Sequence, residues 1–427
     1  MKKINFKSSK GVLLKNTFML YILQFSTYLI ALLVAPYQTR VLGTEVFGGV
    51  LEASAAIIVY FQLIIDFGFL LSATEEVSRE RQNKEKLSRI MTSVTWCKFL
   101  LAAVSFVVLF ILCQTIPAWK QKEVYLYLTF VATFLNSMMP DYLYRGLESM
   151  TAITIRTVII KVFFAAAMLI FLKRPDQVWI IPLLNIIGNG IAMIVAYIHV
   201  NKQFGIKFAA VKVKEVFGEM WRSSTFFFSR IATTAYTALN TIILDIITQS
   251  GAQTGYYTSA NKLITAGKNG LSPIADSMYP YMAKNKDFKL VKKVLLVFEP
   301  VIFLFCAVVF IFAEPLCGWF FGADFAQAGL VLRAMLPVGV IVLPSYILGF
   351  PTLTAMGISK HANYSTIVGS VFHITVLSIL FFTDNLGMIS LAASVSVTEA
   401  VILLYRIIVI IKNRHLMSNT EVTDGNN

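Results

Sequence analysis

The sequence predicts an all-α polytopic membrane protein with about twelve transmembrane helices arranged in two six-helix lobes. Of its 427 residues, 57% are hydrophobic and 14% are charged, whereas soluble domains carry roughly 25% charged residues. Apolar runs recur along the whole chain, and each is long enough to cross a hydrocarbon core. Lys and Arg residues gather between alternate runs, which is typical of a protein threaded repeatedly through a membrane.

The apolar runs define the predicted helices in order, because a helix needs roughly 20 apolar residues to span a bilayer. The runs are 14–36, 48–73, 90–114, 123–145, 150–172, 177–199, 222–248, 254–282, 293–314, 327–351, 361–382 and 388–411. The first run follows a basic head and is too long for the core of a cleavable signal peptide. We therefore expect it to be retained as the first helix.

The connecting segments alternate in charge. Basic clusters follow the second, sixth and eighth runs, whereas the segments after the seventh, ninth and eleventh contain no Lys or Arg. When five residues near run ends, including Arg406, are counted with the adjoining face, 25 of the 37 Lys and Arg residues fall on one face, five on the other and seven inside the runs. Because basic loops are retained in the cytoplasm, both termini are predicted to be cytoplasmic.

The longest cytoplasmic connection, 199–221, divides the chain into six helices plus six. A short repeat supports this division, because Gly48-Gly-Val-Leu-Glu-Ala53 opens one helix and Gly255-Tyr-Tyr-Thr-Ser-Ala260 opens another 207 positions later. The predicted parts are an N-terminal lobe (1–205), a C-terminal lobe (206–417) and a disordered cytoplasmic tail (418–427).

The seven interior charges are the main functional clue. A Lys or Arg at the bilayer centre costs ~2.5–3.5 kcal/mol on insertion scales, so such residues usually face protein or a water-filled cavity. Arg156 and Arg333 lie close to helix ends, so two interpretations stay open for them: they snorkel outward or pair with an acid, or they bind a ligand. The deeper ones are predicted to line a polar cavity and bind substrate, or else to pair with a buried acid. They are Lys98, Lys161, Arg230, Lys262 and Lys268.

Two intramembrane carboxylates have two interpretations. Asp66 and Glu399 are candidates for binding a coupling proton or sodium ion, because such carboxylates are common in ion pathways. Each is also a candidate for a structural ion pair. Most other acids lie near helix ends, so the middle of the membrane is net positive and suits an anionic ligand such as a diphosphate.

Several functions are excluded by what the sequence lacks. No glycine-rich phosphate loop or metal-ligand cluster occurs, and the four His and four Cys residues are scattered, so we expect no cofactor and no bound metal. Buried free thiols are favoured, although Cys113 and Cys317 fall where a bridge is conceivable. The basic residues form no stripe alongside aromatics, which argues against nucleic-acid binding.

Prolines mark two helices. Pro337, Pro344 and Pro351 recur every seven residues in one run, and Pro273 with Pro280 does so in another. Each removes a backbone donor, so these helices either bend during transport or reflect the frequency of proline in membrane helices.

Four stretches resemble the polysaccharide-exporting branch of the multidrug/oligosaccharidyl-lipid/polysaccharide (MOP) exporter superfamily, and in particular O-antigen and capsule repeat-unit flippases. They are Arg40-Val-Leu-Gly-Thr-Glu-Val-Phe-Gly48, Asp66-Phe-Gly-Phe69, Pro140-Asp-Tyr-Leu-Tyr-Arg-Gly-Leu-Glu-Ser-Met150 and Gly255-Tyr-Tyr-Thr-Ser-Ala260. One departure is Arg145, where the family more often has Gln.

The resemblance implies a MATE-like transporter with a central cavity open alternately to each side. It further implies that undecaprenyl-diphosphate-linked oligosaccharides move to the outer leaflet of a bacterial cytoplasmic (inner) membrane. Membrane lipids, a polysaccharide polymerase and chain-length machinery would be its partners. Two alternatives stay open: a multidrug exporter of the same superfamily, which a positive cavity disfavours, and a membrane glycan polymerase or ligase, which the short outward loops disfavour.

Overall fold

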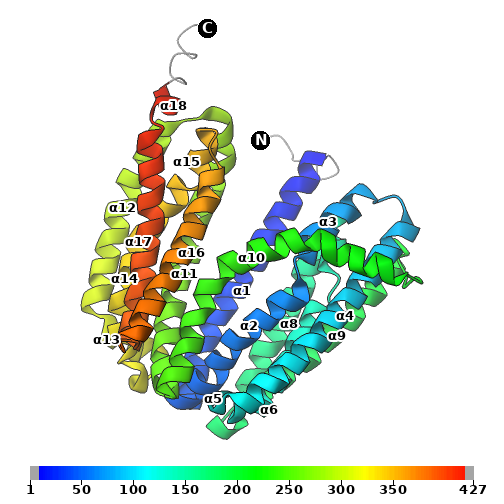
Figure 1. Cartoon of the computed structure of the whole chain (residues 1–427), viewed down its shortest axis with the longest axis horizontal. Coiled ribbons are helices and arrows are strands. Elements are labelled where there is room, and N and C mark those ends of the chain that lie inside the picture. The colour runs from blue at the N-terminus through cyan, green and yellow to red at the C-terminus, as the bar shows by residue number, and fades with distance from the viewer. Residues whose placement is uncertain (1–8, 419–427) are drawn as a thin grey trace. The chain divides into compact units, whose positions relative to one another are not determined.

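The computed structural model describes residues 9–418, apart from the side chains of 9–14, Thr17 and 228–237. Helices and short 3-10 or π turns make up its regular structure, and the described residues contain no strand. The chain forms two compact units (Figure 1): the first comprises residues 1–46 and 50–231, and the second 47–49 and 232–427. The predicted tail after 418 and the side chain of Arg230 lie outside the described residues.

The first unit contains the helices up to the start of α10. They are α1 (Ser9–Glu45), η1 (Val46–Glu52), α2 (Ala53–Asp66), α3 (Phe69–Arg79), α4 (Lys84–Thr115), α5 (Pro117–Lys120), α6 (Glu123–Ser137), α7 (Asp141–Gly146), α8 (Met150–Phe171), η2 (Pro175–Gln177), α9 (Ile180–His199) and η3 (Val200–Phe204).

The second unit contains the end of α10 and the helices that follow. They are α10 (Val213–Thr248), α11 (Gly251–Asn285), α12 (Phe288–Ile311), α13 (Ala313–Phe321), η4 (Ala323–Phe325), α14 (Ala328–Leu348), α15 (Phe350–Ala355), α16 (Lys360–Phe382), α17 (Met388–Lys412) and α18 (His415–Ser418).

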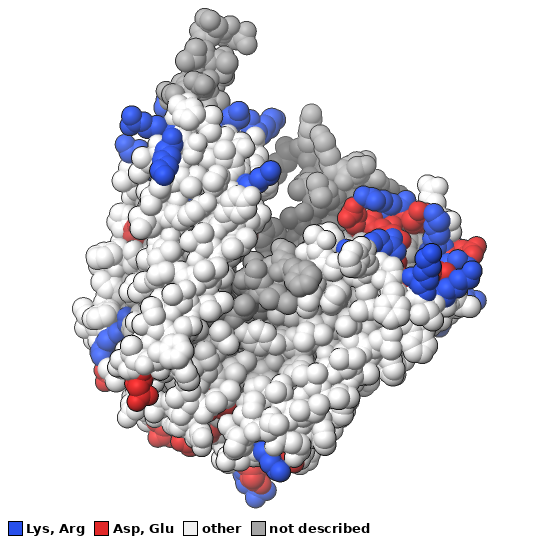
Figure 2. Space-filling view, in the orientation of Figure 1, with Lys and Arg blue, Asp and Glu red and all other residues white. Residues whose placement is uncertain are grey.

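The predicted all-α membrane architecture is confirmed. Each of the twelve predicted spans coincides with one long helix or with two or three consecutive helices. Eight helical runs in the described part are long and apolar enough to cross a membrane. The first of these, Phe18–Arg79, includes two predicted spans. In Figure 2 the sides of the helices are almost free of charge, and charged residues gather at helix ends.

In the first unit, two predicted spans are interrupted where the local sequence cannot continue a helix. Phe67 and Gly68 adopt the left-handed conformation, with φ of 38° and 79°, and separate α2 from α3. Glycine adopts this conformation without a steric penalty. Pro140 separates α6 from α7, since a residue before proline avoids the helical region.

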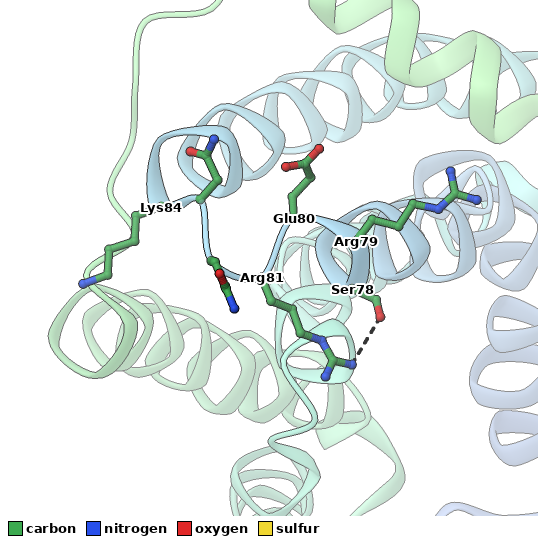
Figure 3. A pocket seen from close by; sticks show the side chains of 7 residues that line it. Ser78, Arg79, Glu80, Arg81 and Lys84 are labelled. Carbon is green, nitrogen blue, oxygen red and sulfur yellow. Dashed lines mark hydrogen bonds between the residues drawn. The ribbon is translucent and has the colours of Figure 1, made fainter.

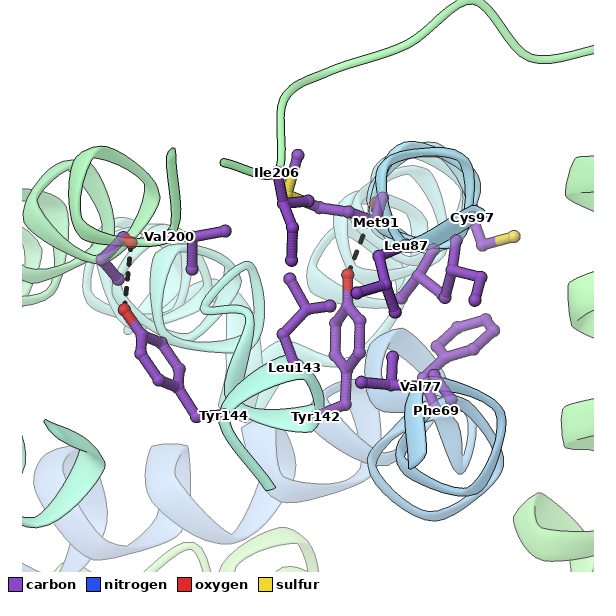
Figure 4. Packing of buried hydrophobic residues seen from close by; sticks show 14 of the residues in the cluster. Phe69, Val77, Leu87, Met91, Cys97, Tyr142, Leu143, Tyr144, Val200 and Ile206 are labelled. Atoms are coloured by element: carbon purple, nitrogen blue, oxygen red, sulfur yellow. Dashed lines mark hydrogen bonds between the residues drawn. The ribbon is translucent and has the colours of Figure 1, made fainter. Parts of the chain in front are cut away.

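A buried cluster joins α3, α4, α7 and α9 within the first unit (Figure 4). The Tyr142 hydroxyl donates to the Met91 carbonyl oxygen at 3.4 Å, and the Tyr144 hydroxyl donates to the Ala196 carbonyl oxygen at 3.1 Å. A Cβ on Gly146 would lie 2.4 Å from Val77 Cγ1, so α7 approaches α3 as closely as only glycine allows. The motif around residues 140–150 therefore specifies packing.

The start of α10 packs on the first unit. The Cys97 thiol of α4 donates to the Val216 carbonyl oxygen, and Arg222 lies 2.9 Å from Glu76 of α3. The ring of Phe227 stacks on Phe67 at 4.3 Å. These contacts place the division between the units inside α10, and the predicted lobe boundary at 205 remains a prediction.

The prolines have different effects within the second unit. Helix α14 contains Pro337 and Pro344 and ends at Leu348, and Pro351 lies in the first turn of α15 after the break at Gly349. Helix α11 instead continues from Gly251 to Asn285 through both of its prolines. Of these five prolines, only Pro351 lies beside a break in its helix, and bending during transport remains a prediction.

The repeated glycine motifs meet within the second unit, to which residues 47–49 belong. A Cβ on Gly48 would lie 2.0 Å from the Gly251 carbonyl oxygen and 2.1 Å from the Gly255 nitrogen. Backbone approaches of this kind tolerate only glycine, as at small-residue interfaces between membrane helices. All four cysteines are buried free thiols.

Candidate functional site

Lys98 of α4 is a buried lysine whose ammonium group is already engaged. Only 6% of the residue is exposed, and its Nζ donates to the Ser137 carbonyl oxygen. That carbonyl lies at the end of α6, where helix carbonyls lack intrahelical partners. Asp66 Oδ1 lies 3.9 Å from Nζ, and the Tyr142 ring centroid lies 5.7 Å from it. In this state Lys98 joins α2, α4 and α6.

Lys161 of α8 has a different environment. It is half-buried, and its ammonium group has no hydrogen-bond or ion-pair partner among the residues that the structure describes. An ammonium in the membrane without an acceptor is available to an anionic ligand. Thr154, two turns earlier on α8, donates instead to the Met19 carbonyl oxygen of α1 and serves packing.

Helix α11 has two chemically distinct faces. Its buried face packs against α14, α15 and α17, and includes Tyr257, Ala260, Ile264, Ala275, Met278 and Met282. The residues of the other face follow the three-and-four spacing of a helix and are half-buried or exposed. They are Lys262, Thr265, Asn269, Ser272 and Asp276. We call this second set the polar face of α11.

Lys262 begins the polar face. Its Nζ lies 5.9 Å from the ring centroid of Phe47, which belongs to the same unit. This cation–π contact holds the ammonium group beside an aromatic ring. Among the side chains that follow, Thr265 and Asn269 donate to no group in the described part of the chain. The polar face therefore presents a cation beside hydroxyl and amide groups.

Lys268 and Glu399 form an ion pair between α11 and α17. Lys268 Nζ lies 2.7 Å from Glu399 Oε1, and the side chains are 25% and 9% exposed. Both residues were predicted as functional, Lys268 for substrate and Glu399 for a coupling ion or a structural pair. The structure places them together, as it places Lys98 near Asp66. The role of each pair during transport remains a prediction.

The two interior charges predicted to lie near helix ends both have acidic partners. Arg156 of α8 lies 2.6 Å from Asp141 of α7, and Arg333 of α14 pairs with Glu314 of α13. Arg333 also donates to the Phe310 carbonyl oxygen. Of the interpretations left open for them, the structure has pairing, and a ligand role for either remains a prediction.

Arg406 is an interior charge that the sequence pattern missed. It was counted with the cytoplasmic residues because it lies near the end of the last run, yet only 9% of it is exposed. Its guanidinium donates to Ser365 Oγ of α16 at 2.9 Å and to Ser345 Oγ of α14 at 2.8 Å. A Cβ on Gly349 would lie 2.9 Å from Arg406 Nη1, so Arg406 holds the break between α14 and α15.

The turn between α3 and α4 encloses a surface pocket of about 730 Å³, lined by Ser78 to Lys84 (Figure 3). Its charges are largely compensated. Arg79 pairs with Glu75, and Arg81 lies 2.7 Å from Glu148. A site for an anion would need uncompensated positive charge. The pocket is therefore a weaker candidate than the polar face of α11.

Comparisons with known proteins identify relatives along nearly the whole chain. The family described as "Polysaccharide biosynthesis protein" matches residues 13–286. A protein of Shigella dysenteriae named "Putative O-antigen transporter" is 25% identical over 399 residues, which cover 92% of this chain and 98% of that protein. A protein of the same name from Escherichia coli strain K12 is 23% identical, covering 92% and 96%.

Solved structures show the same fold. The lipid II flippase MurJ in an inward closed conformation matches with a TM-score of 0.72 at 13% identity, covering 95% of this chain and 91% of that chain. An inward-facing MATE family transporter of the MOP superfamily matches with a TM-score of 0.61 at 12% identity, covering 93% and 99%. The family match confirms the predicted resemblance to proteins of polysaccharide biosynthesis, and the solved structures show that this chain shares the fold of MurJ and of MATE transporters. With eight helical runs in its described part that are long and apolar enough to cross a membrane, the chain is a multi-pass membrane protein.

Proposed function

Because this chain belongs to the polysaccharide biosynthesis protein family, we propose that it is a flippase for lipid-linked oligosaccharide repeat units. The proposed substrate carries an undecaprenyl-diphosphate anchor and a short sugar chain of an O-antigen or similar surface polysaccharide. By alternating access, the protein would move the head group from the cytoplasmic to the outer leaflet, while the lipid tail stays in the bilayer.

The polar face of α11 is the observation that carries this proposal. A spanning helix cannot turn a lysine, an amide, hydroxyls and a carboxylate toward hydrocarbon without a large cost, since a single charge costs ~2.5–3.5 kcal/mol on insertion scales. The opposite face of α11 is already used for packing inside the second unit. The polar face is therefore suited to line an aqueous path.

The chemistry of this face matches a diphosphate-sugar head group. Lys262 supplies a positive charge for phosphate oxygens. Thr265, Asn269 and Ser272 supply hydroxyl and amide groups, which suit sugar hydroxyls. The similarity to proteins named as an O-antigen transporter and as a lipid II flippase supports the same substrate class.

The predicted basic residues differ in how ready they are to bind an anion. Lys161 is half-buried without a partner among the described residues, and we assign it the first contact with the diphosphate. Lys262 lies beside Phe47 on the polar face of α11, and we assign it to the same path. Lys98 and Lys268 have carboxylates nearby, so they would contribute to the path only after those pairs open. Arg230 keeps its proposed role from its depth in the predicted seventh span.

The proposal also includes the membrane in which the protein lies and the proteins with which it works. The charge alternation of the loops supports an inner-membrane protein with both termini in the cytoplasm. A polysaccharide polymerase and chain-length machinery would consume the product outside. An ion gradient, the membrane potential or this downstream consumption would drive transport, and Asp66 and Glu399 remain proposed sites for a coupling ion.

The test replaces the chromosomal gene with variants of single lysines. Lys262→Gln and Lys161→Gln should each lower surface polysaccharide at least tenfold and cause lipid-linked repeat units to accumulate inside the cell. Lys284→Gln is a matched control, because Lys284 is an exposed lysine in the last turn of the same helix α11.

Two outcomes would overturn the proposal. Normal surface polysaccharide in both variants, at normal protein levels, would contradict binding of an anionic head group. Single repeat units at the cell surface of a null strain would instead indicate a polymerase, because a flippase defect keeps them inside.

A further inference from the structure

A fully buried polar network joins four helices of the second unit. Asn240 of α10, His373 of α16 and Thr398 of α17 are each 0% exposed, and Tyr257 of α11 is 1% exposed. Buried polar side chains in a membrane helix bundle are costly unless they hydrogen-bond to one another. Among these residue types, histidine is the one whose ordinary pKa lies near neutral pH.

The orientation of Asn240 follows from its partners. Its Nδ2 donates to the Tyr257 hydroxyl at 3.0 Å and to the Leu391 carbonyl oxygen at 3.4 Å. A carbonyl oxygen only accepts, so the amide nitrogen must face Leu391. The amide oxygen, Oδ1, therefore faces His373 Nε2, from which it lies 2.9 Å away.

This orientation determines the tautomer of His373. Asn240 Oδ1 cannot donate, so His373 Nε2 must carry a hydrogen and donate to it. In the neutral imidazole the second nitrogen, Nδ1, then carries a lone pair in place of a hydrogen. That nitrogen lies 2.8 Å from the Thr398 hydroxyl oxygen. Proton uptake by His373 consequently takes place at Nδ1.

The Thr398 hydroxyl can serve both protonation states without moving. Its oxygen lies 2.8 Å from His373 Nδ1 and 2.7 Å from the Ser394 carbonyl oxygen. When His373 is neutral, the hydroxyl donates to Nδ1. When His373 is protonated, Nδ1–H donates to the hydroxyl oxygen, and the hydroxyl hydrogen turns to Ser394. Only one hydroxyl rotation separates two fully hydrogen-bonded states.

Among the described side chains, few ionisable groups surround this network. Tyr257 on α11 belongs to the network, and Asp245 lies five residues further along α10 than Asn240. Glu399 follows Thr398 on α17 and forms its ion pair with Lys268 of α11. The pair therefore adds no net charge beside Thr398, the residue whose hydroxyl contacts His373.

We propose that His373 is the binding site for a proton that is coupled to transport, taken up from water at Nδ1. Only the process that the proton drives rests on the proposed function, and proton binding at His373 does not. A buried imidazolium raises the energy of any state that keeps the network dry, and water entering between α10, α16 and α17 lowers it. Protonation therefore favours a conformation of this unit in which these helices separate.

Proton binding can be measured without substrate. The chain contains four His residues, so a purified protein labelled with ¹⁵N-histidine gives few imidazole signals. The signals lost in His373→Gln identify its ring. We expect Nδ1 of His373 to titrate reversibly while Nε2 stays protonated throughout. A His373 ring that holds one protonation state between about pH 5 and 8 would overturn the proposal.

Matched variants test the coupling. Proteoliposomes loaded with a pH dye receive the lipid-linked fraction extracted from cells that lack the protein. Substrate-dependent proton flux should fall at least tenfold in His373→Gln. It should persist in His361→Gln, a histidine of the same helix α16 that bonds to Tyr405. Unchanged flux in His373→Gln would overturn the coupling.

A second variant, Thr398→Val, tests the same assignment if His373→Gln fails to fold. The valine removes the acceptor of the protonated ring, and hydrogen bonds to charged groups are about twice as strong as neutral ones, so the titration midpoint should fall by about one pH unit. Thr398→Ser should keep it. A midpoint that stays or rises in Thr398→Val would contradict the assignment. Absence of substrate-dependent flux in the wild type, alongside normal titration, would contradict the proposed function and not the proton site.

Discussion

Lys98 of the first unit and Lys262 of the second are both deep lysines of predicted spanning helices, yet the structure surrounds them differently. Lys98 is 6% exposed, donates to the end of α6 and has Asp66 3.9 Å away. Lys262 is half-buried on the polar face of α11, beside the ring of Phe47. Depth in the sequence does not distinguish the two environments.

The difference shows how one residue type serves stability in one place and ligand binding in another. A lysine whose donors are taken by buried protein oxygens holds helices together, and its removal strands those oxygens. A lysine on an otherwise polar, partly exposed face loses little on removal, because water can replace it. The two classes can be separated by comparing stability and transport for the same substitution.

The largest expected effect is that of Lys98→Met. Removing one partner of a buried ion pair leaves the other uncompensated, and the free energy of unfolding should fall by about 3 kcal/mol. Thermal unfolding in detergent measures this. The double variant Lys98→Met/Asp66→Asn should regain part of the loss, because the stranded carboxylate is gone. An unchanged unfolding temperature in Lys98→Met would show that the pair contributes nothing.

Lys268→Met should have a smaller effect. The lysine side chain is 25% exposed, so water can partly solvate Glu399 after the substitution, and about 2 kcal/mol is expected. A double-mutant cycle with Glu399→Gln measures the coupling between the two side chains. If the two single variants add without coupling, the ion pair seen between α11 and α17 has no energetic role.

The sequence predicted the helices well and their interior contacts poorly. The length of apolar runs is a local property, so each of the twelve spans coincided with helix. The partner of Lys98 depends instead on where α6 ends, because that end frees the Ser137 carbonyl. No pattern around Lys98 contains this information.

Two features of the candidate site can be recognised in the sequence alone. The polar face of α11 follows three-and-four spacing from Lys262 to Asp276 and is legible in the sequence alone. Arg406 lies inside the last apolar run but near its end, so it was not among the seven predicted interior charges. Its partners, Ser345 and Ser365, come from other helices, so only the structure shows what it holds.

A third carboxylate, that of Glu219, allows the compensation of a buried acid by a basic residue to be tested by changing the pH. Glu219 precedes the predicted seventh span, and both Glu219 and Glu76 bind Arg222. Burial and the neighbouring Glu76 raise the pKa of Glu219 from 4.5 to about 7. Because the folded-state pKa is raised, its stabilising contribution is complete below pH 4.5 and is lost as the pH rises through about 7.

The free energy of unfolding, and with it the unfolding temperature, should therefore fall between about pH 5 and 8. Glu219→Gln should remove on the order of 1 kcal/mol of this fall, because Gln does not ionise. Glu85→Gln is the control, because Glu85 is a strongly exposed carboxylate at the start of α4 in the same unit. Equal pH dependence in the wild type and in Glu219→Gln would show that Glu219 keeps an ordinary pKa, and that Arg222 compensates both carboxylates as fully as Lys268 compensates Glu399.

The smallest effect on stability is expected for Lys262→Met, the same substitution as the one described for Lys98. The side chain is half-buried on a polar, partly exposed face where water can take its place, so the free energy of unfolding should change by less than about 0.5 kcal/mol. Transport should nevertheless fall at least as far as in Lys98→Met when each rate is divided by the amount of folded protein. If Lys262→Met unfolds the protein instead, the polar face of α11 is a packing surface, and the distinction between the two lysines disappears.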